Sequence, residues 1–212
     1  MRFFTVKLLS VFIILIIIQS CASVTYVKKH NLNKDIKSMD VCTYFINRIG
    51  DSLLLKQKHI EFTKNGRVKL STTLNTDKDT VQITEKKLFF EKQMVPGLPH
   101  YYCKTRWKTN CRERISCYSQ KKDKQNEKIM FYANDGRILK HIDNFITFNS
   151  YEYTYNKEDK LRCITLKNES GKYIDSIMVK CLKTDKNKNC VTLEHHYTVS
   201  DSLIRIYRKI EY

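Results

Sequence analysis

Glycine, proline and tryptophan are scarce in this chain of 212 residues, which contains five, two and one of them respectively. Tyrosine (13) and phenylalanine (10) are abundant, and aromatic side chains favour strands. No segment shows a long hydrophobic pattern with the 3.6-residue period of a helix. We therefore expect a mainly β protein, and a hydrophobic content of 42% excludes general disorder.

Catalytic and metal-binding motifs are also missing. The sequence has no G-x-S-x-G nucleophile motif, no H-E-x-x-H zinc motif and no glycine-rich phosphate loop. It has no C-x₂-C pair, and the histidine nearest to the cysteines of 103–117 is His100, so we expect neither a metal nor a cofactor. A binding or structural role is the leading hypothesis, and an exported hydrolase without a recognisable motif is the alternative.

The apolar run at the N-terminus is shorter than an ordinary membrane-spanning helix. Residues 8–18 are apolar apart from Ser10, whereas a span needs about 20 such residues. Arg2 and Lys7 precede the run and small or polar residues follow it, as in a cleaved export signal. We therefore expect a signal peptide at 1–20, and an uncleaved anchor is the less favoured alternative.

The residues Ile18-Gln19-Ser20-Cys21 resemble the lipobox of bacterial lipoproteins. An aliphatic residue stands three positions before the cysteine and a small residue just before it, although Gln19 replaces the small residue usual there. The resemblance implies that Cys21 is lipidated and becomes the mature N-terminus, anchored to a membrane of the cell envelope. Ordinary cleavage one or two residues after Cys21, which would give a freely secreted protein, is the alternative.

The rest of the chain divides into a tether and a β domain. Residues 21–40 are polar and lack periodicity, which is typical of a tether after a lipid anchor, with one short helix as the alternative. From residue 41 onward, short apolar runs alternate with turn-forming residues, which indicates antiparallel β-structure. The expected domain covers 41–212 and could divide near 93–100. We expect an antiparallel meander of hairpins with disulfide-braced loops, arranged as an open curved sheet, a sandwich or a barrel.

The polar segments between the apolar runs contain residues that favour turns. Asn65-Gly66 and Asp135-Gly136 predict two-residue hairpin turns, in which the central residues need positive φ. The stretches FYANDGRILKHI, YEYTYNKEDKLRCI and YTVSDSLIRIY resemble the YD-type repeats of rearrangement-hotspot proteins and small envelope proteins built from similar hairpins. The resemblance implies an antiparallel meander, carries no catalytic residue and suggests a toxin-immunity role.

Eight cysteines in an exported chain are most simply paired in disulfides. If Cys21 is lipidated, seven remain, so at least one thiol is free or bonded to another chain. Cys181 and Cys190 flank a polar loop and are the best local pair. Two members of the 103–117 cluster should pair, and the third could reach one of the two distant cysteines. The seven are Cys42, Cys103, Cys111, Cys117, Cys163, Cys181 and Cys190.

The net charge of +17, or +15 once Arg2 and Lys7 are removed, attracts polyanions. For an exported chain the expected partners are an acidic polysaccharide, lipid headgroups or an acidic protein, rather than nucleic acid. The stretch 101–114 interleaves basic and aromatic residues, and a Cys103–Cys111 disulfide would make it a rigid basic loop with an aromatic tip. A solvated, disulfide-braced loop is the alternative. Its candidate binding residues are Arg106, Trp107, Lys108, Arg112 and Arg114.

Residues two apart along a strand lie on the same face, and this alternation defines a second candidate binding surface. Tyr151, Tyr153 and Tyr155 share one strand face and could bind a partner, although cross-strand packing is the commoner use of such a stripe. In 203–212 the isoleucines alternate on one face together with Arg208.

Histidines offer weaker candidates. His59 and Glu61 share a strand face and could form an acid/base pair, whereas His195 and His196 are neighbours that must point to opposite faces. The sequon that begins at Asn168 matters only if the source glycosylates secreted proteins, in which case a secreted effector becomes the alternative function.

Overall fold

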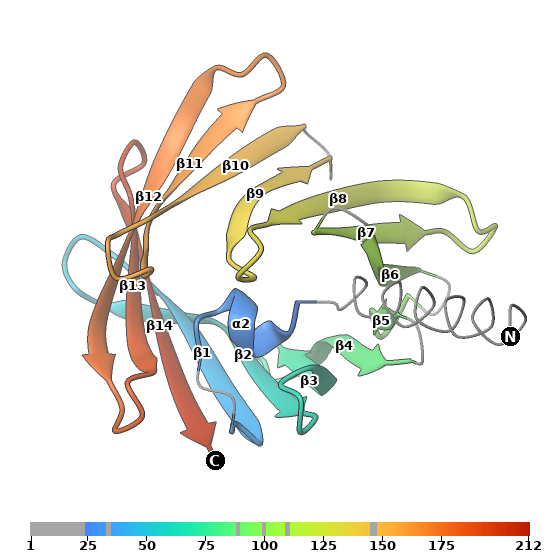
Figure 1. The fold of residues 1–212 in the computed structure, drawn as a ribbon, viewed down its shortest axis with the longest axis horizontal. Coiled ribbons are helices and arrows are strands. Elements are labelled where there is room, and N and C mark those ends of the chain that lie inside the picture. The colour runs from blue at the N-terminus through green and yellow to red at the C-terminus, as the bar shows by residue number, and fades with distance from the viewer. Residues whose placement is uncertain (1–23, 33–34, 88–89, 99–100, 109–110, 145–147) are drawn as a thin grey trace, which may run out of the picture.

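The computed structural model is a closed ring of antiparallel strands with a short helix inside it (Figure 1). It describes residues 24–32, 35–87, 90–98, 101–108, 111–144 and 148–212. The helix is α2 (Tyr26–Lys29), and the strands are β1 (Ser38–Ile46), β2 (Ser52–Phe62), β3 (Val68–Leu74), β4 (Thr80–Lys86), β5 (Glu91–Met94), β6 (Tyr102–Lys108), β7 (Arg112–Tyr118), β8 (Lys124–Tyr132), β9 (Ile138–Asp143), β10 (Asn149–Tyr155), β11 (Leu161–Asn168), β12 (Tyr173–Thr184), β13 (Cys190–Tyr197) and β14 (Ser202–Glu211).

Each strand pairs with the next along the chain, and β14 closes the ring against β1 (Figure 1). The closing pair runs from Ser38 opposite Glu211 to Ile46 opposite Leu203. The expected antiparallel meander is therefore confirmed, and among the arrangements considered it takes the form of a barrel. No helix in the described ranges is long and apolar enough to cross a membrane.

The hairpin turns repeat one five-residue pattern. In the turn from Thr63 to Arg67, the Thr63 amide donates to the Arg67 carbonyl and the Gly66 amide donates to the Thr63 carbonyl, both at 2.8 Å. Gly66 has a φ of 69°, whereas Asn65 has no positive φ. This is a type I turn followed by one left-handed residue, so the expectation of two-residue turns was wrong. The pattern recurs at 47–51, 75–79, 119–123, 133–137, 156–160, 168–172 and 185–189.

Several of these five-residue turns have a residue other than glycine at the position with positive φ. An asparagine or aspartate at the first position of the turn helps to explain how they form. The Asn156 side-chain oxygen accepts hydrogen bonds from the amides of Glu158 and Lys160, at 3.0 and 2.9 Å. Such bonds hold the turn locally, and Asp159 takes the left-handed conformation with a φ of 60°. The side chain at the start of the turn thus supports a conformation that glycine would otherwise supply.

Alternate residues of each strand face the interior. Met39 of β1 is fully buried and lies opposite Ile60 of β2, also fully buried, and opposite Ile210 of β14. Residues in register on paired strands share a face, so the inner face can be followed from strand to strand around the ring. It reaches Cys103 opposite Cys117 on β6 and β7, and His141 opposite Tyr151 on β9 and β10.

The segment before β1 packs inside the barrel, and it contains the short helix α2 that was the alternative to a tether. Val27 of α2 is 1% exposed, and its amide donates to the Gly66 carbonyl at 3.3 Å. A Cβ on Gly66 would lie 2.9 Å from Cγ2 of Val27, so this contact requires glycine. Apolar residues scattered through the polar stretch complete the core, which consists of Val27, Leu32, Ile36, Met39, Ile60, Phe62 and Val68.

Two disulfides connect neighbouring strands. Cys181–Cys190 joins β12 to β13 across the turn 185–189 and is the local pair expected from the sequence. Cys103–Cys117 joins β6 to β7, so the cluster pairs differently from the Cys103–Cys111 bond considered above. Cys42, Cys111 and Cys163 are free thiols. Cys111 has a positive φ of 49° at the start of β7.

Candidate functional site

The β6–β7 hairpin separates its basic and aromatic side chains onto opposite faces. Trp107 lies opposite Glu113, and Arg106 lies opposite Arg114. Glu113 is 5% exposed and faces the interior, where the Trp107 ring lies 5.5 Å from that of the buried Tyr132. The expectation of an aromatic tip on a basic loop is therefore wrong, because the strand pleat turns Trp107 inward and Arg106 outward.

The cations of the hairpin stand opposite one another on the outer face. Arg106 faces Arg114 across β6 and β7, and on the same strands Lys108 is in register with Arg112. Lys92 of β5 is in register with Lys104 of β6. Like charges directly opposite each other on a sheet are destabilising. We call this surface the basic face and define it by Lys92, Lys104, Arg106, Arg112 and Arg114.

Aromatic rings lie beside these cations. Tyr102 and Tyr118 are opposite each other on β6 and β7, and their rings stack with centroids 5.5 Å apart. The Lys104 ammonium lies 5.3 Å from the Tyr102 ring and 6.0 Å from the Tyr118 ring, and that of Lys92 lies 5.5 Å from the Tyr102 ring. These distances are within the range of cation–π contacts, which favour positions of the two ammonium groups over the rings.

Few carboxylates balance the basic face. Oε2 of Glu127 lies 3.5 Å from Nε of Arg114 and 2.9 Å from Nζ of Lys124, so one acid is shared by two cations. Glu85 lies opposite Lys92 and is ion-paired to Lys87 at 2.7 Å. Within the described ranges, Arg106 has no ion-pair partner. The face therefore has an excess of positive charge that the protein itself does not neutralise.

The tyrosine stripe faces the interior. Tyr151 stacks on His141 with ring centroids 3.9 Å apart, and the Tyr153 hydroxyl lies 2.8 Å from Nδ1 of His141. Burial lowers the pKa of His141 to about 3, with Lys128 adding to the effect, and burial raises the pKa of Tyr153. These contacts make the stripe part of the barrel wall, which is the cross-strand packing named as its commoner use.

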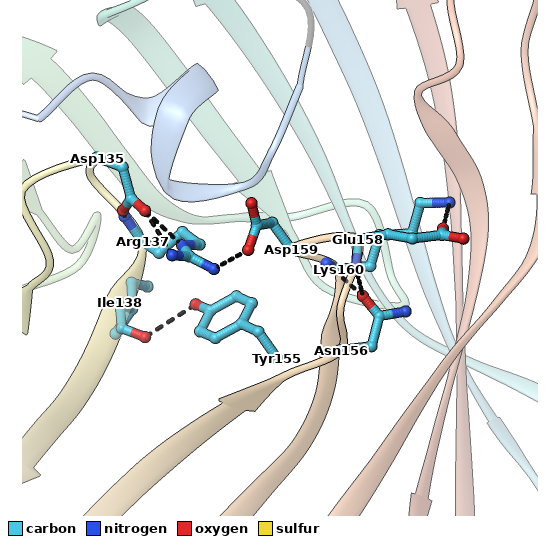
Figure 2. Close-up of polar contacts among 8 residues, drawn as sticks. All are labelled: Asp135, Arg137, Ile138, Tyr155, Asn156, Glu158, Asp159 and Lys160. Carbon is cyan, nitrogen blue, oxygen red and sulfur yellow. Dashed lines mark hydrogen bonds and ion pairs between the residues drawn. The ribbon is translucent and has the colours of Figure 1, made fainter.

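Tyr155, the third member of the stripe, braces two neighbouring turns (Figure 2). Its hydroxyl donates to the Ile138 carbonyl at 2.8 Å, and the Arg137 guanidinium lies 5.2 Å from its ring. Arg137 also bridges Asp135 of its own turn and Asp159 of the next turn (Figure 2). Arg137, beside the Tyr155 ring, thus links the turns 133–137 and 156–160.

The histidine candidates are engaged elsewhere. Nδ1 of His59 lies 2.6 Å from Asp40, and Glu61 pairs with Lys69 at 3.1 Å, so the two do not form an acid/base pair with each other. His195 is on the inner face, whereas His196 lies 3.0 Å from Asp201, as the alternation of a strand requires.

A metal centre is not found in the part of the chain that the structure describes, where no cluster of three or more ligating side chains occurs. Cys21, the expected lipidation site, lies outside the described residues.

Sequence reasoning missed Lys92 of the basic face and Tyr118 beside it. Lys92 belongs to the short strand β5, nine residues before the basic stretch begins at Tyr101, and Tyr118 follows the end of that stretch. Both join the face only through strand register, which no spacing rule in the sequence states. The disulfide could have supplied the signal, because Cys103 opposite Cys117 places Tyr102 opposite Tyr118.

No family model matches this chain, and no curated protein matches its sequence. Among solved structures, a porin-like protein from Bacteroides uniformis ATCC 8492 is 12% identical with a TM-score of 0.40, over 84% of this chain and 57% of that one. A LolA superfamily protein from Nitrosomonas europaea is 5% identical with a TM-score of 0.39, over 86% and 88%. This chain thus spans little more than half of the porin-like protein, and similarity at this level carries no functional argument.

Proposed function

We propose that this chain is an exported protein that binds an acidic polymer through the basic face of β5–β7. The observation that carries the proposal is Arg106 directly opposite Arg114. A fold does not need such a pair, since like charges in register weaken a sheet. An anionic partner would turn this arrangement from a cost into an attraction.

The spacing of the cations suits an extended polyanion. Residues two apart on a strand are about 6.8 Å apart, so Lys104 and Arg106 begin a row of charges along β6. Arginine presents a planar fork that matches carboxylate, sulfate or phosphate groups. Tyr102 and Tyr118 add flat apolar surface of the kind that stacks on sugar rings. An acidic polysaccharide combines both features.

The disulfides and the N-terminal sequence both support export of the protein. Two disulfides are typical of proteins that fold in an oxidising compartment. The N-terminal signal-like sequence at 1–20 supports the same compartment. Attachment to an envelope membrane through lipid on Cys21 completes the proposal and would place the basic face near polymers of the cell surface.

The binding test compares two double variants with the same loss of charge. Arg106→Gln/Arg114→Gln removes one opposed pair, and the control Arg162→Gln/Lys180→Gln removes two exposed cations from the outer face of β11 and β12. Titration with polygalacturonate at low salt should give binding about tenfold weaker for the first variant and within about twofold of the parent for the control.

Added salt should weaken parent binding, because exposed charges are screened. Equal weakening in both variants would show that net charge alone attracts the polymer and would overturn the assignment to the basic face. Absence of binding by the parent protein at low salt would overturn the proposed polymer class.

A further inference from the structure

Two further cations lie on the inner face of the barrel wall, on strands remote from the basic face. Val41 of β1 packs against the apolar core, with Arg208 of β14 opposite it on one side and Lys58 of β2 on the other. Neighbouring strands are about 4.8 Å apart, so the backbones of Arg208 and Lys58 are about 10 Å apart. Both long side chains extend from the inner face of the sheet, one on either side of Val41.

Neither cation has a carboxylate partner in the described part of the chain. Nη1 of Arg208 donates to the Cys190 carbonyl at 3.3 Å, and burial lowers the pKa of this guanidinium. In contrast, Arg205 on the outer face of the same strand pairs with Glu194 at 2.7 Å. A cation that is partly removed from water without an anion is costly.

Lys58 experiences the same surroundings. Burial and the neighbouring Lys56 lower the pKa of Lys58, and Glu91 offsets this in part. Lys56 lies opposite Thr43, which places it two residues along the same inner face. Positive charge therefore accumulates along this wall.

His30 adds a third group to the same space. It caps α2, and its ring is tilted by 37° against that of Tyr26, with ring centroids 4.1 Å apart. Because Tyr26 and Val41 pack against the same core, His30 lies on the same side of the sheet as Arg208 and Lys58. His30 is solvent-exposed, so water and small solutes reach it.

We propose that Arg208, Lys58 and His30 form a binding site for one phosphate group inside the barrel. Arginine can donate two hydrogen bonds from its fork to one phosphate, and lysine adds a compact charge. The two permanent cations match the charge of a phosphate dianion, and His30 can donate a further hydrogen bond. Free phosphate and the headgroup of a phospholipid share this chemistry. The site uses other strands and the other face of the sheet, so it stands independently of the proposed function.

The test measures stabilisation by inorganic phosphate relative to sodium chloride at equal ionic strength. The parent protein should show a saturable rise of the unfolding midpoint with phosphate, as expected for a ligand of the folded state. Arg208→Gln should weaken this response about tenfold or more, whereas Lys209→Gln, the next residue on the outer face, should respond like the parent. Because Arg208 lacks an anionic partner, Arg208→Gln should be at least as stable as the parent without phosphate.

Further variants and a competing lipid complete the test. If Arg208→Gln fails to fold, Lys58→Gln takes its place with the same expected loss. The variant Arg106→Gln/Arg114→Gln should keep the full phosphate response, which separates this site from the basic face. Competition of dihexanoyl phosphatidic acid with phosphate would identify a lipid headgroup as the source, and its failure to compete would identify soluble phosphate. Equal effects of phosphate and chloride, or an unchanged response in both inner-face variants, would overturn the site.

Discussion

The two faces of the β6–β7 hairpin handle charge in opposite ways. On the inner face, the Glu113 carboxylate accepts hydrogen bonds from Nζ of Lys29 at 2.6 and 2.8 Å and from the Tyr132 hydroxyl at 2.6 Å. On the outer face, Arg106 stands opposite Arg114 and has no ion-pair partner in the described ranges. The inner face of this hairpin supplies partners for the Glu113 carboxylate, whereas its outer face has an excess of cations.

The contrast is local to this part of the barrel. Elsewhere on the outer face, Asp40 lies between Lys209 and His59, and Glu194 lies opposite Arg205. These pairs follow the usual preference for opposite charges in register. The like-charged pairs of the basic face are therefore not a general consequence of a lysine-rich chain, and this contrast is the basis of the proposed binding role.

The largest effect should follow from breaking the inner pair. Glu113→Gln leaves the Lys29 ammonium, which is 14% exposed, without its carboxylate. Removing one partner of a buried ion pair costs about 3–5 kcal/mol, and urea unfolding should show a loss of that size. The double variant Lys29→Met/Glu113→Gln should recover most of it. A loss below about 1 kcal/mol would show that the pair behaves like a surface one.

Acid should weaken the inner wall in a defined pH window. The pKa of His141 is lowered to about 3 and that of His195 to about 4, from an ordinary value of 6.5. Both rings are neutral in the folded protein, so below pH 6.5 the unfolded chain binds protons that the folded one does not. Stability is fully present above pH 6.5 and falls as the pH drops toward 4, by about 1.4 kcal/mol per pH unit for each histidine.

His141→Gln should flatten this slope by one proton between pH 6.5 and 4, measured as the unfolding free energy against pH. His196→Gln, which removes an exposed histidine from the outer face, is the control for replacing a histidine outside the inner wall. Equal slopes in the parent and in His141→Gln would contradict the assignment of His141 as a buried neutral ring.

Alternation along single strands could be read from the sequence. The isoleucines of 203–212 and Arg208 share the inner face of β14, as their spacing predicted. Cys181 pairs with Cys190 because a short polar turn brings adjacent strands together. Such features depend on neighbours within about ten residues, where period and turn chemistry are decisive.

Relations between strands could not be read in this way. The sequence identified Arg106 and Arg114 as candidates, but it did not show that they lie opposite each other. That pairing depends on the register of β6 and β7, which the turn and the Cys103–Cys117 bond determine. The burial of Val27 depends on a space enclosed by strands distant in the sequence, so its polar surroundings predicted a tether. Closure of β14 on β1 likewise has no local signal.

The smallest effect gives the most direct test of the central claim that the basic face is kept for a ligand. The measurement is the unfolding midpoint at low salt, without polymer, of Arg106→Gln and of Glu194→Gln. Loss of the opposite-charge pair in Glu194→Gln should destabilise by about 0.2–1 kcal/mol. Arg106→Gln should be as stable as the parent or more so, because it relieves repulsion from Arg114 and breaks no described ion pair. A clear fall in the midpoint of Arg106→Gln would contradict the account and make Arg106 a structural residue.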